Sequence, residues 1–567
     1  MKEWVYADRD GFRFPLDPAM LCLIHGYALS GSGSNVWTRA VAQALCRSGE
    51  TVHLVCQDHR PEQHDFVAAA YQYEPDGARQ TLFERTTSYT GRAILHRPRL
   101  DLLPVYVRPP AGVTSMVSIL DLSDDEIQTY LERNERALLR IVGENDVSAM
   151  HVNHVVLMSV VARRVSLATG VPYAVMPHGS DLEYVVRHDT RMQEMATEAL
   201  DGAARILVLS DELARRVHEV LPNIRDFDRK LTRTSVGVDA GEFRLVRRGE
   251  RRESIGRLAE TIAGMERGKR AEQSEYLAQH LRDDLSIEGV REVLAASAAY
   301  LKQRPDADAE AKLERIDWDR DGVVTYVGNL RGFKGVQALL TAFPVVLQSS
   351  PHARLVVVGR GPLRELLEAF LIALARDQRR LARHLMEWGE VLEGEGPEPF
   401  LPVTRYFGRL DREGRLDAWF AAATQLLDPA HVVFTGHLEH KALCHLYPCC
   451  DVAVFPSIVA EAGPLVLIEA MASGCYPMGT YFAGMGANID IAASAIDPQQ
   501  AQYMRLRRDP EHLVEDIATN VIGALGLKGS CRSALREVAV ANYDWERIAQ
   551  TLSRTLHTLG GARTELT

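Results

Sequence analysis

Two glutamates, Glu461 and Glu469, flank a predicted helix start in the segment VFPSIVAEAGPLVLIEAMASGC (454–475). A short apolar strand ends before the loop that carries Glu461, and the helix that carries Glu469 begins near Pro464. Proline is favoured in the first turn of a helix because its missing N–H group would be unpaired there anyway. The segment therefore predicts a strand, a loop and a helix that place two carboxylates beside one helix N-terminus.

The first turn of this helix has the chemistry of an anion site. Its backbone amides, at Leu465 and Val466, have no partner within the helix, and the helix dipole adds positive potential at the same end. Phosphate groups bind such helix N-termini. A diphosphate fits this description, and the carboxylates beside it can accept hydrogen bonds from sugar hydroxyl groups.

The elements that must position this helix alternate between strands and helices. The run LCLIHGY (21–27), a glycine- and serine-rich loop, a helix over 36–47 and the strand TVHLVCQ (51–57) predict the opening of a doubly wound parallel sheet. The alternation recurs at 147–153, 171–179 and 205–210, and again at 323–330, 353–359, 431–436 and 451–457. Residues 71–120 are less regular and are compatible with a hairpin on the sheet edge.

The length of 567 residues and this pattern predict two doubly wound α/β domains, residues 1–240 and 241–540. Two insertions, about 244–320 and 376–430, interrupt the second domain. The charge-rich helical pattern of the first insertion predicts a solvated face, and GEGPEPFLP (394–402) in the second predicts a loop. Ligands of such sheets bind at the carboxyl ends of the strands, so we expect the site in a cleft between the two domains.

Composition excludes several classes of protein. The formal net charge of −11, from 65 basic and 76 acidic residues, argues against a broad nucleic-acid-binding surface. No run of 18 or more apolar residues predicts a membrane span, and the N-terminus lacks the apolar core of a secretory signal. The eight cysteines form no Cys-x-x-Cys pair, so we expect reduced thiols and a cytoplasmic protein.

The pair Glu461 and Glu469, followed by AMASG, resembles the hallmark of the retaining family-4 glycosyltransferases of GT-B fold (glycosyl transferases group 1). That hallmark is a glutamate, seven residues and a second glutamate. The resemblance implies two Rossmann-like domains that face a central cleft, the first for the acceptor and the second for the nucleotide sugar. It also implies that Glu461 binds hydroxyl groups of the donor sugar and that Glu469 binds the ribose. The usual Phe-Gly inside the motif is Gly463-Pro464 here.

The turn VGNLRGFKG (327–335) resembles the segment of that family whose arginine and lysine hold the donor diphosphate. Lys334 takes the position of the lysine. Asn329 takes the position of the arginine, which is a departure from the family pattern. A diphosphate in a partly dry cleft needs more than one cation, so we expect Arg331 to supply the missing charge.

Two segments of the first domain also resemble the family. HGYALSGSGSNVW (25–37) is similar to its glycine-rich first loop, with Ser32 and Gly33 in the positions of the two glycines, and a missing Cβ at Gly33 permits close approach of a phosphate. In MPHGSDLEY (176–184), His178 takes the position of a histidine near the anomeric centre. We expect His178 to orient the reacting sugar and Asp181 to shape its loop; a loop histidine with satisfied hydrogen bonds is the alternative.

The second domain and the C-terminus complete the resemblance. VVVGRGPLREL (356–366) is similar to the Gly-x-Gly-Pro-Leu turn, and the loop after 431–436 is expected near the nucleotide base. NYDWERIA (542–549) resembles the closing helix, so residues 541–567 are expected to pack back on the first domain. The expected catalytic residues are His178, Glu461, Lys334 and Arg331. The expected donor-binding residues are Gly33, Asn329, Gly361, His437, Leu438, Gly463, Pro464, Leu465, Val466 and Glu469.

Three other patterns carry weaker hypotheses. A zinc site at His437, His440, Cys444 and His445 lacks a second ligand cluster, so a helix surface explains these residues better. The resemblance to GT-B enzymes implies that no metal and no cofactor are needed. The acidic run at 121–125 is typical of a cap for a helix over 124–142. The basic cluster at 379–383 is compatible with peripheral membrane association, although a solvated helix face explains it better.

The resemblance implies retaining, metal-independent transfer of a hexosyl unit, in carbohydrate biosynthesis, from a UDP- or GDP-type sugar to an acceptor. The acceptor, whether a sugar, a small molecule or a lipid-linked group, is not identified by the sequence. Two alternatives stay open: a sugar-nucleotide 2-epimerase of the same architecture, whose family lacks this glutamate spacing, and a non-catalytic sugar-nucleotide-binding module, which Asn329 favours. Association of two copies through the insertions also stays open.

Overall fold

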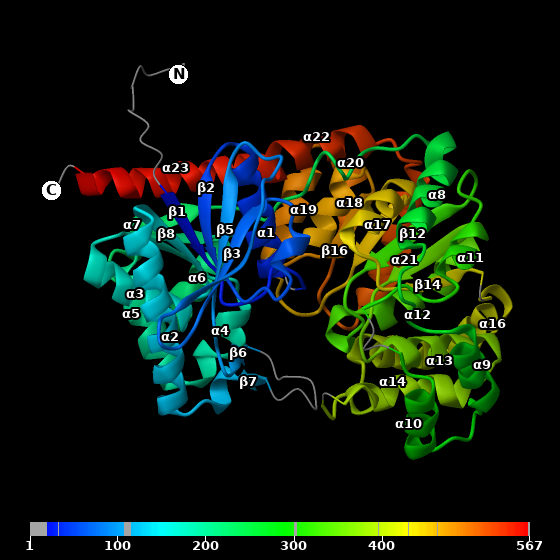
Figure 1. Ribbon diagram of the computed structural model, residues 1–567. Coiled ribbons are helices and arrows are strands. Elements are labelled where there is room, and N and C mark those ends of the chain that lie inside the picture. The colour runs from blue at the N-terminus through cyan, green and yellow to red at the C-terminus, as the bar shows by residue number, and fades with distance from the viewer. Residues whose placement is uncertain are drawn as a thin grey trace. The chain divides into compact units, whose positions relative to one another are not determined.

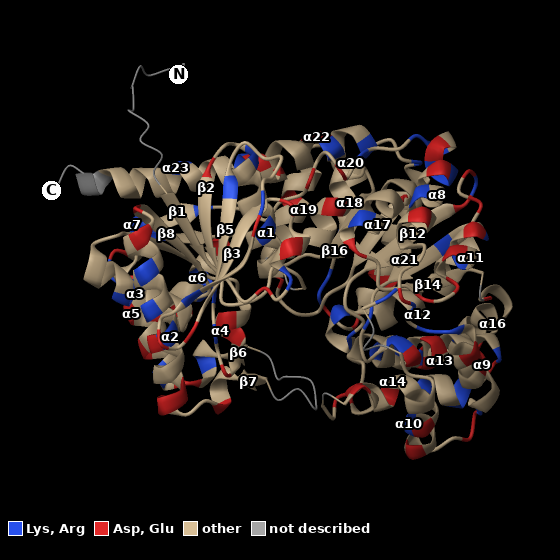
Figure 2. Ribbon diagram, viewed as in Figure 1, with Lys and Arg blue, Asp and Glu red and all other residues tan. Residues whose placement is uncertain are grey.

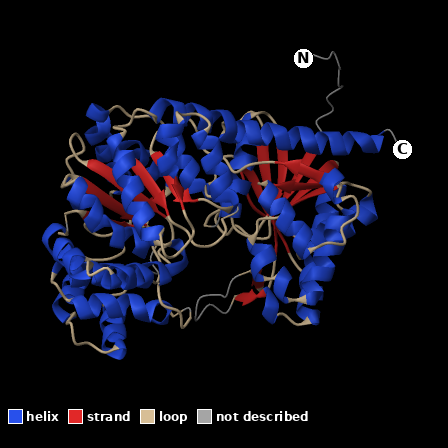
Figure 3. Ribbon diagram, turned by 180° about the vertical axis from the view of Figure 1, so that it is seen from behind, coloured by secondary structure: helices blue, strands red, loops and turns tan. Residues whose placement is uncertain are grey.

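The computed structural model describes residues 20–31, 33–106, 115–299, 303–394, 396–428, 430–461 and 463–564. The chain divides into two compact units (Figure 1). Unit 1 comprises Met1–Val236 with Trp545–Thr567, and unit 2 comprises Gly237–Asp544. In each unit helices flank a sheet (Figure 3), which is the layering that alternating strand and helix patterns produce.

Unit 1 is built around a nine-stranded sheet in the order β11-β10-β9-β8-β1-β2-β5-β3-β4. All neighbouring strands are parallel except β3 and β4, which form an antiparallel hairpin at the sheet edge, within the less regular part of the sequence. The strands of the unit are β1 (Met20–Ile24), β2 (Thr51–Val55), β3 (Val67–Tyr73), β4 (Arg79–Glu84), β5 (Arg92–Pro98), β6 (Leu103–Val105), β7 (Met116–Ser118), β8 (Val147–Asn153), β9 (Tyr173–Met176), β10 (Arg205–Val208) and β11 (Leu231–Arg233). The short strands β6 and β7 pair only with each other.

The helices of unit 1 cover this sheet. They are α1 (Gly33–Arg47), α2 (Asp124–Glu144), α3 (Met158–Thr169), α4 (Ser180–Tyr184), α5 (Thr190–Gly202), α6 (Asp211–Val220), α7 (Phe227–Lys230) and α23 (Trp545–Thr564). Helix α2 begins with a capping box, in which Ser123 and Glu126 pair with each other's backbone amides, so the acidic run at 121–125 starts a helix. The C-terminal helix α23 packs on α1 and β8, and Ser553 and His557 both contact Glu50 at 2.6 and 3.0 Å.

Unit 2 contains a six-stranded, wholly parallel sheet in the order β14-β13-β12-β15-β16-β17. Strand order therefore reverses between β12 and β15, which is the topological switch point of a doubly wound sheet. The strands are β12 (Gly322–Val327), β13 (Ala353–Val358), β14 (Val432–Gly436), β15 (Val452–Phe455), β16 (Tyr476–Thr480) and β17 (Arg505–Leu506). The helices between and after these strands are α12 (Val336–Ser349), α13 (Arg364–Ala375), α17 (His440–Leu446), α18 (Leu465–Ala472), α19 (Ala483–Ala493), α20 (Pro498–Ala501), α21 (Leu513–Gly526) and α22 (Arg532–Tyr543).

Both insertions of unit 2 are helical. The first carries α8 (Arg251–Ile262), α9 (Ala271–His280), α10 (Ile287–Ala296) and α11 (Ala309–Glu314), and the second carries α14 (Arg379–Glu393), α15 (Leu401–Arg412) and α16 (Leu416–Leu426). They pack on each other, because α10 contacts α14 and the Leu381 N–H donates to Asp283 Oδ1 at 3.0 Å. The expected loop at 394–402 is shorter than predicted, since α15 already begins at Leu401.

The sequence pattern predicted a solvated charged face for the first insertion, but some of its charged residues are buried. Arg251 and Lys269 are only 2% and 3% exposed, and each pairs with carboxylates of the Rossmann-like core of unit 2. Elsewhere acidic and basic residues are interspersed in both units (Figure 2). Among the described residues, no helix combines the length and the apolar character that crossing a membrane requires.

Candidate functional site

The switch point of the unit 2 sheet places the two predicted donor segments next to each other. Strands β12 and β15 are neighbours, and their carboxyl ends lead into the turn that carries Lys334 and into the loop that carries Glu461. The Ile458 N–H donates to the Phe333 carbonyl oxygen at 2.9 Å, which ties the two segments together. Gly335, at φ 75°, permits this approach, because a Cβ there would lie 2.0 Å from the Pro456 carbonyl oxygen.

Lys334 and Glu461 form an ion pair at this edge of the sheet. Their side chains are 23% and 22% exposed, so both remain accessible from solvent. An ammonium and a carboxylate in contact at a switch point offer one group for a phosphate and one for a hydroxyl. A ligand with both groups can replace the contact between the two side chains.

Helix α18 begins beside this pair without a side-chain cap. Pro464 is the N-cap residue rather than part of the first turn, and its carbonyl oxygen accepts a hydrogen bond from the Leu467 N–H at 3.1 Å. The N–H groups of Leu465 and Val466 donate to none of the described residues, and both residues are half-buried. The helix therefore keeps the amides of its first turn available for an anion.

Glu469 lies on the same helix and is only 3% exposed. Its Oε1 accepts from His440 Nδ1 at 2.7 Å, whereas Oε2 has no hydrogen-bond partner among the described residues. The neighbouring Tyr447 hydroxyl is also buried without such a partner, and burial, aided by the charge of Glu469, raises the pKa of Tyr447. A buried carboxylate oxygen without a donor is costly, so this position fits a ligand hydroxyl.

The turn after β12 carries Asn329 and Arg331. Asn329 is exposed, and its carbonyl oxygen accepts from the Tyr326 hydroxyl at 2.8 Å. A carboxylate that the sequence did not point to, Glu393 of α14, accepts the Gly332 N–H at 3.2 and 3.0 Å. The second insertion thus places a negative charge against the turn that was expected to bind a diphosphate.

Gly361 belongs to the turn after β13, which packs on the turn after β12. Its φ is 153°, and a Cβ there would lie 2.2 Å from the Leu330 carbonyl oxygen. The Leu330 N–H donates to the Arg360 carbonyl oxygen at 2.8 Å, and the Leu363 N–H donates to the Leu330 carbonyl oxygen at 3.1 Å. The fold itself therefore requires glycine at position 361, because the two backbones touch there.

His437 and Leu438 follow β14, and the first insertion lies against them. The His437 N–H donates to the Arg304 carbonyl oxygen at 3.0 Å, and the Asp306 N–H donates to the Thr435 carbonyl oxygen at 2.7 Å. Burial, together with the charge of Arg360, lowers the pKa of His437, so its ring is neutral at pH 7. These contacts bring the first insertion to the turn that was expected to lie near the nucleotide base.

A small pocket opens at this place. It is lined by the two turns and the first insertion: Gly268, Lys269, Ala299, Arg304, Asp306, Gly359, Arg360, Arg364, Glu365, Gly436 and His437. The sequence did not single out the insertion residues, because the charge run around them predicts a solvated helix face.

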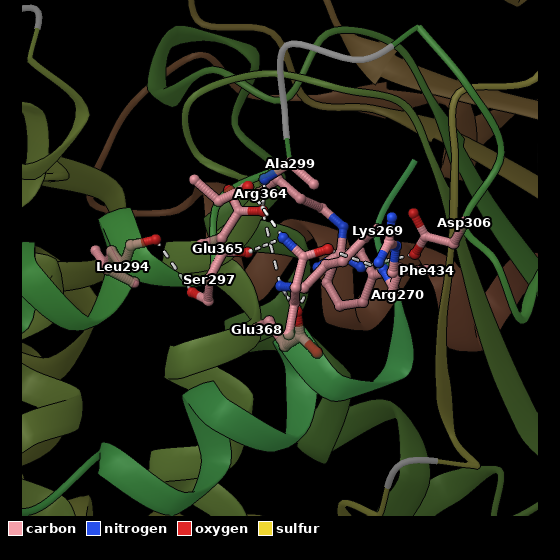
Figure 4. Close-up of polar contacts among 12 residues, drawn as sticks. Lys269, Arg270, Leu294, Ser297, Ala299, Asp306, Arg364, Glu365, Glu368 and Phe434 are labelled. Carbon is pink, nitrogen blue, oxygen red and sulfur yellow. Dashed lines mark hydrogen bonds and ion pairs between the residues drawn. The ribbon is translucent and has the colours of Figure 1, made fainter. Parts of the chain in front are cut away.

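Buried charges, several of which line this pocket, join the first insertion to α13 (Figure 4). Lys269 Nζ lies 2.6 Å from Glu368 Oε2, and Arg364 contacts Glu368 at 2.7 Å and Asp306 at 2.9 Å. The Arg364 guanidinium also lies 4.1 Å from the centre of the Phe434 ring. Burial raises the pKa of Glu365, whereas Arg364 and Lys269 lower the pKa of Glu368 to about 2 despite its burial. The network fixes the insertion on the sheet.

In unit 1, His178 follows β9 and faces a cluster of buried histidines. His178 Nε2 lies 2.7 Å from Asn153 Oδ1, and its ring centre is 4.7 Å from that of His154. Burial, and then the proximity of His154, His25 and His151, lowers the pKa of His178 well below its usual value. A neutral His178 can orient and polarise a ligand without carrying charge.

The other histidines of the cluster also come from the carboxyl ends of neighbouring strands. His25 follows β1, His151 lies in β8, and His154 follows β8; all three are at most 3% exposed. Strands β1 and β8 flank the point where the strand order of unit 1 reverses. The runs LCLIH and MHVNH were the available signal, because each places a histidine at the end of an apolar strand.

Asp181 is needed by the fold of unit 1, whereas Gly33 is not. The fully buried Asp181 carboxylate accepts the N–H groups of Val155 at 3.0 Å and His178 at 3.3 Å, which fixes the loop of His178. Gly33 is the first residue of α1, and a Cβ there would meet no atom within 4 Å. The fold does not require glycine at position 33, so any requirement comes from a ligand. Ser32 lies outside the described residues.

No cluster of three or more His, Cys, Asp or Glu side chains with metal-site geometry occurs in the part of the chain that the structure describes. His440 contacts Glu469, and the Cys444 thiol donates to the Lys441 carbonyl oxygen at 3.3 Å. His440 and Cys444, two residues of the zinc pattern in the sequence, therefore have other partners.

The family model for glycosyl transferases group 1 matches residues 412–494, which include Glu461 and Glu469. Over these residues the chain is similar to the glycosyl transferases of group 1. The phosphatidyl-myo-inositol mannosyltransferase of Mycobacterium tuberculosis (strain ATCC 25618 / H37Rv) is 24% identical over 290 residues, which are 49% of this chain and 59% of that protein. The chain thus spans about three fifths of the length of the curated relatives that it matches.

Solved glycosyltransferase structures share the fold. Sucrose-phosphate synthase from Thermosynechococcus elongatus is 15% identical, with a TM-score of 0.53 over 96% of this chain and 100% of that one. An α,α-trehalose-phosphate synthase (UDP-forming) from Burkholderia vietnamiensis is 14% identical, with a TM-score of 0.51 over 96% and 99% of the two chains. The predicted GT-B fold and the resemblance to group 1 are confirmed. Membership of the retaining family 4 and the roles of the site residues stay predictions.

Proposed function

We propose that the protein transfers a hexosyl unit, with retention of configuration and without a metal ion, from a UDP- or GDP-type sugar to an acceptor. The observation that carries this proposal is the contact between Lys334 and Glu461 at the switch point of the unit 2 sheet, beside the uncapped start of α18. A cation, free amides and two carboxylates in one place fit a diphosphate that is linked to a sugar and a ribose.

In this proposal the bond between the anomeric carbon and the diphosphate oxygen breaks, and a bond to an acceptor oxygen forms on the same face of the sugar. The acceptor proton passes to the departing diphosphate, so no separate enzyme base is needed. Lys334 and the amides of Leu465 and Val466 stabilise the negative charge that develops on the diphosphate, which is often the largest catalytic contribution. Arg331 was expected to assist, but Glu393 lies against its turn.

In this proposal the carboxylates of Glu461 and Glu469 bind the sugar and the nucleoside of the donor. Glu461 exchanges its contact with Lys334 for hydrogen bonds from hydroxyl groups of the donor sugar. Glu469 accepts from the ribose through Oε2, which has no hydrogen-bond partner among the described residues. His178, held by Asn153 and kept neutral by burial, orients the reacting sugar. These roles require no metal and no cofactor.

The relatives support a sugar nucleotide as donor without identifying it. The relative that is 24% identical is named a phosphatidyl-myo-inositol mannosyltransferase. The catalytic domain of starch synthase IV from Arabidopsis thaliana, which shares the fold at a TM-score of 0.51, was solved with ADP and acarbose. The acceptor of the present protein, its site on unit 1 and a cytoplasmic location remain part of the proposal.

A donor panel tests the proposal. The protein is incubated with UDP- and GDP-hexoses and an acceptor mixture, and release of UDP or GDP is followed together with the anomeric configuration of the product by NMR. We expect transfer with one donor, and we expect Glu461→Gln to abolish it while the thermal melting temperature stays unchanged. Glu253→Gln, in the exposed α8 pair with Arg257, is the matched control.

The same panel separates the alternatives. Conversion of a nucleotide sugar into its 2-epimer without an acceptor would identify an epimerase. Binding of a nucleotide sugar without hydrolysis or transfer under any condition would identify a binding module, and the transferase proposal would then fail.

A further inference from the structure

The turn after β12 brings less positive charge to the diphosphate than the family pattern requires. Asn329 is neutral and exposed at the position where an arginine was expected. Lys334 is one cation, and it is already in contact with Glu461. Arg331 lies in a turn whose Gly332 N–H is bound to the Glu393 carboxylate. A diphosphate carries two or more negative charges, so a further cation is needed.

Arg360 lies in the turn that touches this one. Its carbonyl oxygen accepts the Leu330 N–H at 2.8 Å, so Arg360 and Arg331 project from two turns that are hydrogen-bonded to each other. Burial and the charge of Arg331 both lower the pKa of Arg360. The charge of Arg360 in turn contributes to the lowered pKa of His437. Arg360 thus stands within electrostatic reach of both the phosphate turn and the turn expected near the base.

Arg360 differs from the other cations that line its pocket because its side chain has no carboxylate partner among the described residues. Lys269 pairs with Glu368, Arg364 pairs with Asp306, and Arg304 pairs with Glu266 at 3.2 Å. The half-buried Arg360 side chain has no ion pair or hydrogen bond with any described residue. A partly desolvated guanidinium beside a second positive charge is unfavourable, and a bound anion would relieve both costs.

From this geometry we infer that Arg360 supplies the second cation for the donor diphosphate, in place of the arginine that Asn329 replaces. The inference rests on the proposed function, because it assigns a residue to the same donor site. Its planar guanidinium offers paired donors that match two phosphate oxygens, which the Lys334 ammonium does not. The base, next to His437, and the diphosphate, next to Lys334, then lie on either side of Arg360.

Calorimetric titration of the full chain with UDP, GDP and inorganic pyrophosphate tests this assignment. We expect Arg360→Gln to weaken binding of the preferred nucleoside diphosphate and of pyrophosphate by about tenfold or more. Arg320→Gln, an exposed arginine of the same unit, should leave both affinities unchanged. In the double variant Asn329→Arg with Arg360→Gln, an arginine at the family position should restore most of the lost affinity.

The outcomes distinguish this inference from the proposed function. Wild-type-like binding in Arg360→Gln would overturn the inference and leave the transferase proposal standing. A loss of affinity that Asn329→Arg does not restore would assign Arg360 a structural role and would also overturn it. If the wild-type protein binds neither nucleoside diphosphate nor pyrophosphate, the donor site itself is wrong and both proposals fail.

Discussion

His440 Nδ1 lies 2.7 Å from Glu469 Oε1, and the other carboxylate oxygen of Glu469 has no hydrogen-bond partner among the described residues. The contact holds a carboxylate that is only 3% exposed in one orientation, with a single oxygen left for a ligand. His440 therefore orients the Glu469 carboxylate. This arrangement gives the second glutamate of the pair a defined direction, which the sequence could not show.

Replacing Glu469 by glutamine should weaken binding of the preferred nucleoside diphosphate by about tenfold, because a charged hydrogen bond to the ribose is lost. Binding of inorganic pyrophosphate should stay within twofold of wild type, since pyrophosphate has no ribose. Calorimetry with both ligands measures the difference. Glu439→Gln, an exposed neighbour, is the control. Equal losses for the nucleotide and for pyrophosphate would contradict a ribose contact.

Replacing Lys334 by glutamine should instead weaken binding of both ligands by about tenfold or more, because both carry the diphosphate. The melting temperature should change little, since the contact between Lys334 and Glu461 is partly exposed and such pairs contribute at most about 1 kcal/mol. Calorimetry and thermal unfolding are the two measurements. Intact pyrophosphate affinity in this variant would remove Lys334 from the phosphate site.

The sequence predicted both doubly wound sheets and the donor helix, because each depends on patterns within short segments. The glutamate spacing, the strand before it and the proline at 464 lie within a single run. Long-range contacts left no such pattern. Lys269 meets Glu368, and Glu393 meets Gly332, across wide sequence separations, and nothing in the local charge pattern distinguishes these residues from solvated neighbours.

The histidine cluster of unit 1 could be predicted only in part from the sequence. His25 and His154 each follow an apolar strand, so their placement at strand ends could be read from the sequence. Their proximity could not, because it depends on β1 lying next to β8 in the sheet, and strand order is not encoded locally. The same reason explains why Arg360 was missed: its turn becomes part of the donor site only through the pairing of β12 with β13.

The buried charges that line the pocket should be essential for stability. Asp306→Asn removes one partner of Arg364, whose side chain is only 4% exposed, and leaves a buried charge without its full compensation. The expected loss is about 3–5 kcal/mol in the free energy of unfolding, measured with urea. The double variant Asp306→Asn with Arg364→Met should lose less than the sum of the two single changes. Arg257→Gln, in an exposed pair on α8, should cost under about 0.5 kcal/mol.

Unit 1 should lose stability in acid because its buried histidines resist protonation. Burial lowers the pKa of both His25 and His151 to about 3, whereas an unfolded histidine titrates near its usual 6.5. Between these values the unfolded chain binds protons that the folded unit does not, so stability falls as pH decreases from about 6.5 towards 3. Each such histidine contributes up to about 1.4 kcal/mol per pH unit to this loss of stability.

Hydrogen exchange of peptides from β1 and β8 should therefore accelerate between pH 7 and pH 5, beyond the intrinsic pH dependence of exchange. His151→Phe, which keeps a ring against Trp37, should reduce this acceleration, whereas substitution of the exposed His280 should not; an identical pH dependence in wild type and His151→Phe would refute the assignment.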